Sequence, residues 1–121
     1  LGGRVHHART MQVFTDRAQP GSVTAYRNFT ATIESITRFE AEDALVFHVK
    51  LENSMAVAVP YDPQGLAIRL DREFFPAAFA EASGAIPARG ISFAYLVIAG
   101  GPAGRANLSV REKFSVIVPR P

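Results

Sequence analysis

The sequence predicts an all-β domain, an antiparallel β-sandwich of about seven to nine short strands. Three observations predict it. Several segments alternate hydrophobic and polar residues, as half-buried strands do. Turn residues separate these segments at intervals of roughly 8–15 residues. The chain also lacks the regular succession of strands and long helices that builds a parallel sheet. A small β-barrel is the alternative architecture.

The length and the composition indicate one domain. The chain has 121 residues, 48% of them hydrophobic and nine of them Phe, which suffices for a core of its own. We expect the polar residues 1–10 to form a flexible N-terminal arm and residues 11–121 to form a single β-sandwich domain. The chain contains no cysteine, which excludes disulfides, thiolate metal sites and cysteine nucleophiles.

Four strands are expected in the first half of the chain. Residues 11–14 form a short strand, and residues 23–36 form a second one beyond a Pro-Gly turn. Residues 45–52 form the clearest strand, because hydrophobic and polar positions alternate over its whole length. Its buried face is predicted to carry Leu45, Phe47, Val49 and Leu51, and its other face Val46, His48, Lys50 and Glu52. Residues 55–59 form the fourth strand.

Four more strands are expected in the second half. A β-turn at residues 61–65 leads into a strand over residues 66–70. Residues 91–98 are apolar on both faces, which predicts a central strand that is covered on both sides. Two further strands follow a glycine-rich loop, at residues 106–110 and at residues 114–118.

A Phe-rich segment at residues 71–83 is the one helical candidate. Phe74, Phe75 and Phe79 can share one face at helical spacing, Pro76 suits a first turn, and Gly84 would end the helix. We expect a short helical insertion packed over the end of a sheet. The three phenylalanines either cover the core or form an exposed patch that docks a partner protein or a second copy, so Phe74, Phe75 and Phe79 are the candidate docking residues.

The order of segments between about residues 29 and 118 carries a resemblance. An alternating strand ends in a polar break at residues 45–53, a short strand follows at residues 65–70, and the turn at residues 86–90 leads into an aromatic-rich strand at residues 91–97. This pattern resembles the telokin-like, immunoglobulin-fold domains of bacterial secreted and lipoprotein-type proteins, including the DUF4352 family. Residues 74–83 depart from it and look like an insertion.

The resemblance implies an immunoglobulin-like sandwich with a non-enzymatic role. It also implies a bacterial protein that is secreted, periplasmic or anchored to the envelope. The chain begins with Leu1, so a signal sequence or an anchor could have preceded it. No motif residues are carried over from the family to this chain.

Residue types that carry chemistry are sparse and scattered. His6 and His7 are adjacent, His48 is far from both, and no third ligand completes a metal site near them. The acidic turn with Glu40, Glu42 and Asp43 lacks the spacing of a calcium loop. No G-x-S-x-G motif or phosphate-binding glycine loop occurs. We therefore expect no enzymatic activity, no catalytic residues, no metal site and no cofactor.

Charge and hydropathy limit the partners. The net charge is +2 and the basic residues are dispersed, so we expect no nucleic acid partner. The longest apolar stretch is shorter than the roughly 20 residues of a membrane-spanning helix. The first hypothesis is a binding or structural module of unknown specific role, engaged in protein–protein interaction or self-association in the bacterial cell envelope. The second is a carrier of a small apolar ligand, with a pocket between the sheets lined by Phe47, Phe93 and Tyr95.

Overall fold

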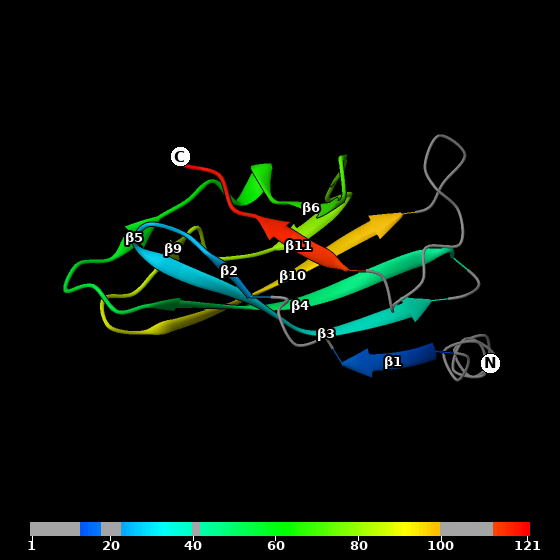
Figure 1. Cartoon of the computed structure of the whole chain (residues 1–121), viewed down its shortest axis with the longest axis horizontal. Helices are drawn as coiled ribbons and strands as arrows, with labels where there is room; N and C mark the ends of the chain where they lie inside the picture. The colour runs from blue at the N-terminus through cyan, green and yellow to red at the C-terminus, as the bar shows by residue number, and fades with distance from the viewer. Residues whose placement is uncertain (1–12, 18–22, 40–41, 100–112) are drawn as a thin grey trace, which may run out of the picture.

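The computed structural model describes residues 13–17, 23–39, 42–99 and 113–121 (Figure 1). Its strands are β1 (Val13–Arg17), β2 (Val23–Ala25), β3 (Phe29–Phe39), β4 (Ala44–Asn53), β5 (Val59–Pro60), β6 (Ala67–Leu70), β7 (Glu73–Pro76), β8 (Phe79–Glu81), β9 (Ala85–Ile86), β10 (Ile91–Ala99) and β11 (Phe114–Ile117). A 3₁₀ turn, η1 (Pro63–Gly65), lies where the sequence predicts a β-turn. The predicted arm at residues 1–10 and the predicted strand at residues 106–110 lie outside the described residues.

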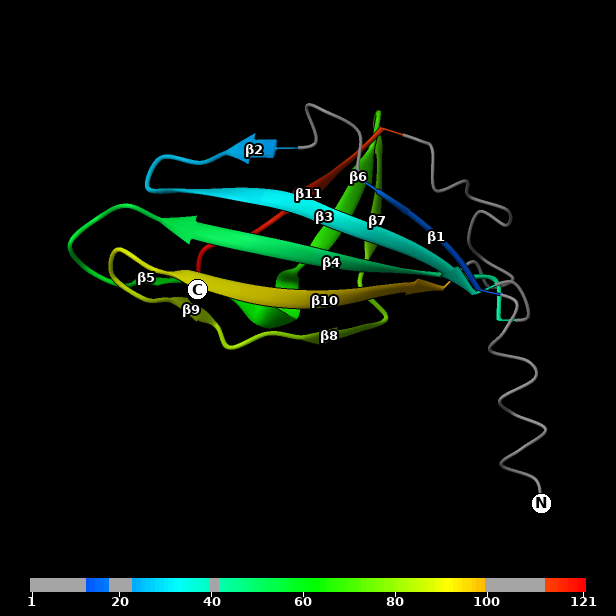
Figure 2. The ribbon, with the colours of Figure 1, turned by 90° about the horizontal axis from the view of Figure 1, so that it is seen from below.

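The strands form three antiparallel sheets. A six-stranded sheet has the order β1-β3-β4-β10-β8, with β2 pairing to β3. A three-stranded sheet has the order β11-β6-β7, and β5 pairs with β9. In Figure 2 the strands of the small sheet cross the long strands of the large sheet steeply, as in orthogonal sheet packing. The prediction of an all-β, antiparallel architecture is confirmed.

The predicted number of strands and the alternative barrel are both wrong. The described strands outnumber the expected seven to nine, because turns divide the chain into shorter pieces than the hydrophobic pattern suggests. The path of the large sheet begins at β1 and ends at β8 without closing, so the described strands form open sheets and not the alternative barrel.

The core lies between the large sheet and the three-stranded sheet. Leu45, Phe47, Val49 and Leu51 are all buried, which confirms the face predicted for β4. From the small sheet, Ile68, Phe114 and Val116 complete the same cluster. The rings of Phe47 and Phe114 meet edge to face with centroids 5.0 Å apart, a favourable arrangement of aromatic quadrupoles. Alternating strand residues therefore supply the core from both layers.

A β-bulge in β3 corrects the phase of its side chains. Ile33 pairs with Val49 and Ser35 pairs with His48, so Glu34 is an extra residue without a partner of its own. Ile33 and Ile36 are three positions apart and would face opposite sides of a regular strand. The bulge lets both be buried.

The predicted helix at residues 71–83 is wrong, because this segment forms β7 and β8. Asp71 takes a φ of 57° in the hairpin turn after β6, a conformation that Asp tolerates better than most residues. Phe75 then pairs with Ile68 in β6, while the amide of Ala78 donates to the carbonyl of Val97 in β10. The segment is therefore not a helical insertion but the connection that carries the chain from the small sheet to the large one.

The predicted strand at residues 55–59 is reduced to Val59–Pro60. Asn53, at the end of β4, organises the loop that replaces the rest. Its buried side chain donates to the carbonyls of Val57 at 2.9 Å and Pro87 at 3.0 Å and accepts from the amide of Met55 at 2.8 Å. These side-chain bonds hold the loop against the β9–β10 turn instead of a strand ladder.

Candidate functional site

The most distinctive surface of the described residues is the solvent-facing side of β10. Ala94, Leu96 and Ile98 point into the core. The alternate positions point outward, and there Ile91, Phe93 and Tyr95 are 47%, 51% and 44% exposed. An antiparallel sheet with one covered face normally shows polar residues on the other. The outer side of β10 departs from this rule over most of its length.

A stack of rings stands on this surface. His48 in β4 lies directly opposite Tyr95 in β10, and their rings stack with centroids 4.6 Å apart and an interplanar angle of 9°. The ring of Phe93 stacks on the same imidazole at 5.1 Å. Cross-strand pairs of this kind fix side-chain positions on a sheet. The rings are therefore held in place while much of their area stays in water.

Phe79 extends the apolar surface onto the neighbouring strand. It pairs with Val97 across the β8–β10 ladder and is 64% exposed. We call the surface formed by His48, Phe79, Ile91, Phe93 and Tyr95 the outer aromatic face.

Charged side chains border the outer aromatic face on both sides of β10. On β4, Lys50 lies opposite Phe93 and Glu52 lies opposite Ile91. On β8, Glu81 lies opposite Tyr95. An apolar centre with a charged rim is the anatomy of a protein–protein interface.

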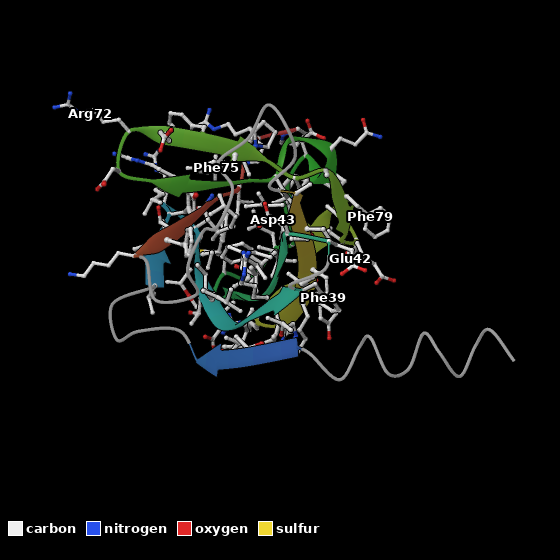
Figure 3. All side chains as sticks on the ribbon, turned by 90° about the vertical axis from the view of Figure 1, so that its right-hand side faces the viewer. Phe39, Glu42, Asp43, Arg72, Phe75 and Phe79 are labelled. Atoms are coloured by element: carbon white, nitrogen blue, oxygen red, sulfur yellow. The ribbon has the colours of Figure 1, made fainter. Side chains whose placement is uncertain are left out.

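The structure separates the three predicted docking residues. Phe79 belongs to the outer aromatic face, and in Figure 3 it projects from the side of the molecule. Phe75 packs against the core beneath the β6–β7 hairpin. Phe74 is 61% exposed, but it lies on the three-stranded sheet, where the guanidinium of Arg69 sits 6.0 Å from its ring. The docking role of the three together stays a prediction, and they share no single face.

Those candidate metal-binding residues that the structure describes do not come together. His6, His7 and Glu40 lie outside the described residues. Asp43 forms an ion pair with Arg38 at 2.8 Å across the β3–β4 hairpin, and His48 is part of the ring stack. Within residues 13–17, 23–39, 42–99 and 113–121, no group of three or more His, Asp or Glu side chains is arranged to hold a metal ion.

The residues proposed to line an apolar ligand pocket face opposite ways. Phe47 is fully buried between the sheets, while Phe93 and Tyr95 lie on the outer side of the same sheet. An open groove of about 450 Å³ lies elsewhere, between η1 and β8, and is lined by Pro63, Gln64, Ala77, Ala78, Phe79, Ala80 and Ala82. This lining is mostly alanine and offers few groups that would orient a ligand.

The sequence contained the signal for the outer aromatic face. Residues 91–98 are apolar on both faces, which predicts a strand covered twice. The prediction of a strand covered on both sides is wrong, because the structure covers the side of Leu96 and leaves the side of Phe93 open. Sequence alone could not reveal the partnership with His48, because that depends on the register between β4 and β10.

Comparisons with protein-family models, with curated proteins and with solved structures found no match for this chain. None of the helices in the described part of the chain is long and apolar enough to cross a membrane.

Proposed function

We propose that this protein is a non-enzymatic binding module whose docking surface for another protein is the outer aromatic face. The observation that carries the proposal is the outward row of Ile91, Phe93 and Tyr95 on β10, a strand with apolar residues on both sides and a core on only one. Aromatic side chains held rigidly at a surface bury a large area at small entropic cost, which makes them effective anchors of interfaces.

Two of the sheet edges, β8 and β7, are less suited to docking than this face. β8, at one end of the large sheet, is only three residues long. β7, at the edge of the small sheet, contains Pro76, which cannot donate a ladder hydrogen bond. Short edge strands and edge prolines both discourage strand addition. The proposed location is the bacterial envelope, and the resemblance of residues 29–118 to secreted bacterial domains supports it.

Site-specific photo-crosslinking in the native cell tests this function. A photoreactive phenylalanine analogue replaces Phe93, and the matched control places it at Phe74, a similarly exposed aromatic on the other sheet. We expect position 93 to yield one discrete protein adduct. Excess wild-type protein should suppress this adduct, whereas an excess of the Phe93→Thr variant should not. Equal, diffuse labelling at both positions would overturn the proposal.

A further inference from the structure

The outer aromatic face has charges of opposite sign on its two sides. β10 runs between β4 and β8 in the large sheet, as Figure 2 shows. Lys50 on β4 flanks Phe93, and Glu81 on β8 flanks Tyr95. Lys50 and Glu81 thus lie on opposite sides of the aromatic row. Along β10 their positions differ by the two residues that separate Phe93 from Tyr95.

A two-fold rotation matches these charges. When a second copy is turned about an axis that runs along β10 in the plane of the surface, its β4 lies over β8 of the first copy. Its Lys50 and His48 then face Glu81 of the first copy, and the symmetry repeats the same contact on the other side. Glu52 lies further along β4 than Lys50 and remains at the rim. The surface is therefore complementary in charge to itself.

The apolar part fits the same arrangement. Two such faces would stack as sheets do in a sandwich, about 10 Å apart, with the aromatic rows at the centre. The second copy would then cover β10 on its open side, as its doubly apolar sequence predicts.

From the charge pattern and the aromatic row we infer that the outer aromatic face binds a second copy of this chain in a face-to-face, two-fold dimer. This inference rests on the proposed function, because it names the partner of the same surface. In this dimer, Lys50 of each copy lies next to Glu81 of the other copy. The few large side chains in contact place it at the small end of specific interfaces, among the weak and reversible ones.

Charge reversal tests the inference through association in solution. Sedimentation velocity is measured over a concentration series for the wild type, Lys50→Glu, Glu81→Lys, the equimolar mixture of the two variants, and the double variant. Each single variant places like charges together at both symmetric contacts, so we expect its self-association to weaken by about tenfold or more. The mixture and the double variant restore opposite charges and should regain association close to that of the wild type.

Controls separate the face from other causes. Both charged side chains lie on the solvent side, so the far-ultraviolet circular dichroism of each variant should equal that of the wild type. Phe93→Thr combined with Tyr95→Thr should abolish the dimer, whereas Phe74→Thr should leave it intact.

Three outcomes overturn the inference: a wild type that stays monomeric at every concentration, a mixture that fails to recover, or a dimer that survives the loss of Phe93 and Tyr95. A monomeric wild type that still gives a discrete adduct at position 93 with a different protein removes the second copy as partner and leaves the proposed function standing. A monomer without such an adduct removes both.

Discussion

The hydroxyl group of Tyr26 donates a hydrogen bond to the carbonyl oxygen of Val116 at 2.8 Å, across 90 positions of sequence. The same hydroxyl accepts a hydrogen bond from the amide of Val118 at 3.0 Å, and the ring stacks on Phe29 with centroids 4.7 Å apart. Tyr26 precedes β3 of the large sheet, while Val116 belongs to β11 of the small one. One hydroxyl group therefore ties the two layers together beside the core.

Tyr26→Phe should destabilise the protein by about 1–2 kcal/mol, because it leaves a backbone carbonyl and a backbone amide without their partner. The ring and its stacking on Phe29 are retained, so the loss reports the hydroxyl alone. Urea unfolding followed by circular dichroism measures it. If the urea midpoint and the slope of the transition both stay unchanged, water replaces the tyrosine hydroxyl group without loss of stability.

The same substitution at Tyr61 should stabilise the protein instead of destabilising it. Tyr61 is buried, and its hydroxyl has no hydrogen-bond partner within the described part of the chain. An unpaired buried hydroxyl costs free energy, so Tyr61→Phe should raise the unfolding free energy by up to about 1 kcal/mol. Calorimetry then shows a melting temperature higher by roughly 2–4 °C. A lower melting temperature would reveal an ordered partner for the hydroxyl.

Asn53→Ala should lower the unfolding free energy by about 2–4 kcal/mol. The substitution removes the buried side-chain oxygen that accepts from one backbone amide, and the side-chain NH₂ group that donates to backbone carbonyls. The loss should also have a local signature. The amide of Arg89 donates to the carbonyl of Met55 at 2.9 Å, and this bond depends on the loop that Asn53 holds. Hydrogen exchange of Arg89 should therefore accelerate more than that of Leu96 in the central strand. Uniform acceleration would mean that Asn53 supports only global stability.

The hydrophobic pattern was sufficient to predict the fold class and the core face of β4. The period of two between Leu45 and Leu51 is a local signal, and it survives folding because every second residue meets the small sheet. The helix prediction for the segment of Phe74 and Phe79 failed because a run of phenylalanines and alanines fits the spacing of a helix as well as that of a strand. Its pairing with Ile68 and Val97 is decided by tertiary contacts, which override the weak local preference.

The candidate site was predictable only in part. The sequence predicts Phe79 as a docking residue, but it predicts the doubly apolar strand of Phe93 as one covered on both sides. Whether the second side of that strand is covered depends on whether the rest of the chain provides another layer there. The ring stack on His48 depends on the register between the strands. Neither is encoded within one segment. The bulge at Glu34 was likewise invisible, because it corrects a phase shift between two segments that each look regular.

The outer aromatic face should contribute little to folding. Phe93→Thr and Tyr95→Thr should each change the unfolding free energy by less than about 1 kcal/mol, which is the worth of one cross-strand pair. Phe47→Ala, on the buried side of the same sheet, should cost about 3–5 kcal/mol. Thermal unfolding of the three variants gives the comparison. Losses at Phe93 or Tyr95 as large as that at Phe47 would mean that these rings serve the fold rather than a partner.

Deletion of Glu34 should be tolerated, although a one-residue deletion in a strand normally turns the side chains beyond it to the wrong face. Without Glu34, Ser35 alone separates Ile33 from Ile36, and a regular strand buries both isoleucines. We expect a stable fold with a loss of about 1 kcal/mol or less, caused by the altered curl of β3 where the bulge had twisted it.

Deletion of Thr32 is the matched control for that experiment. To keep Ala31 and Ile36 in the core, this variant must turn Ile33 into water and bury Glu34, so it should lose several kcal/mol through exposed apolar area and a buried charge. Urea unfolding of both deletions distinguishes the cases. Equal losses would show that the bulge is not the feature that sets the phase of β3.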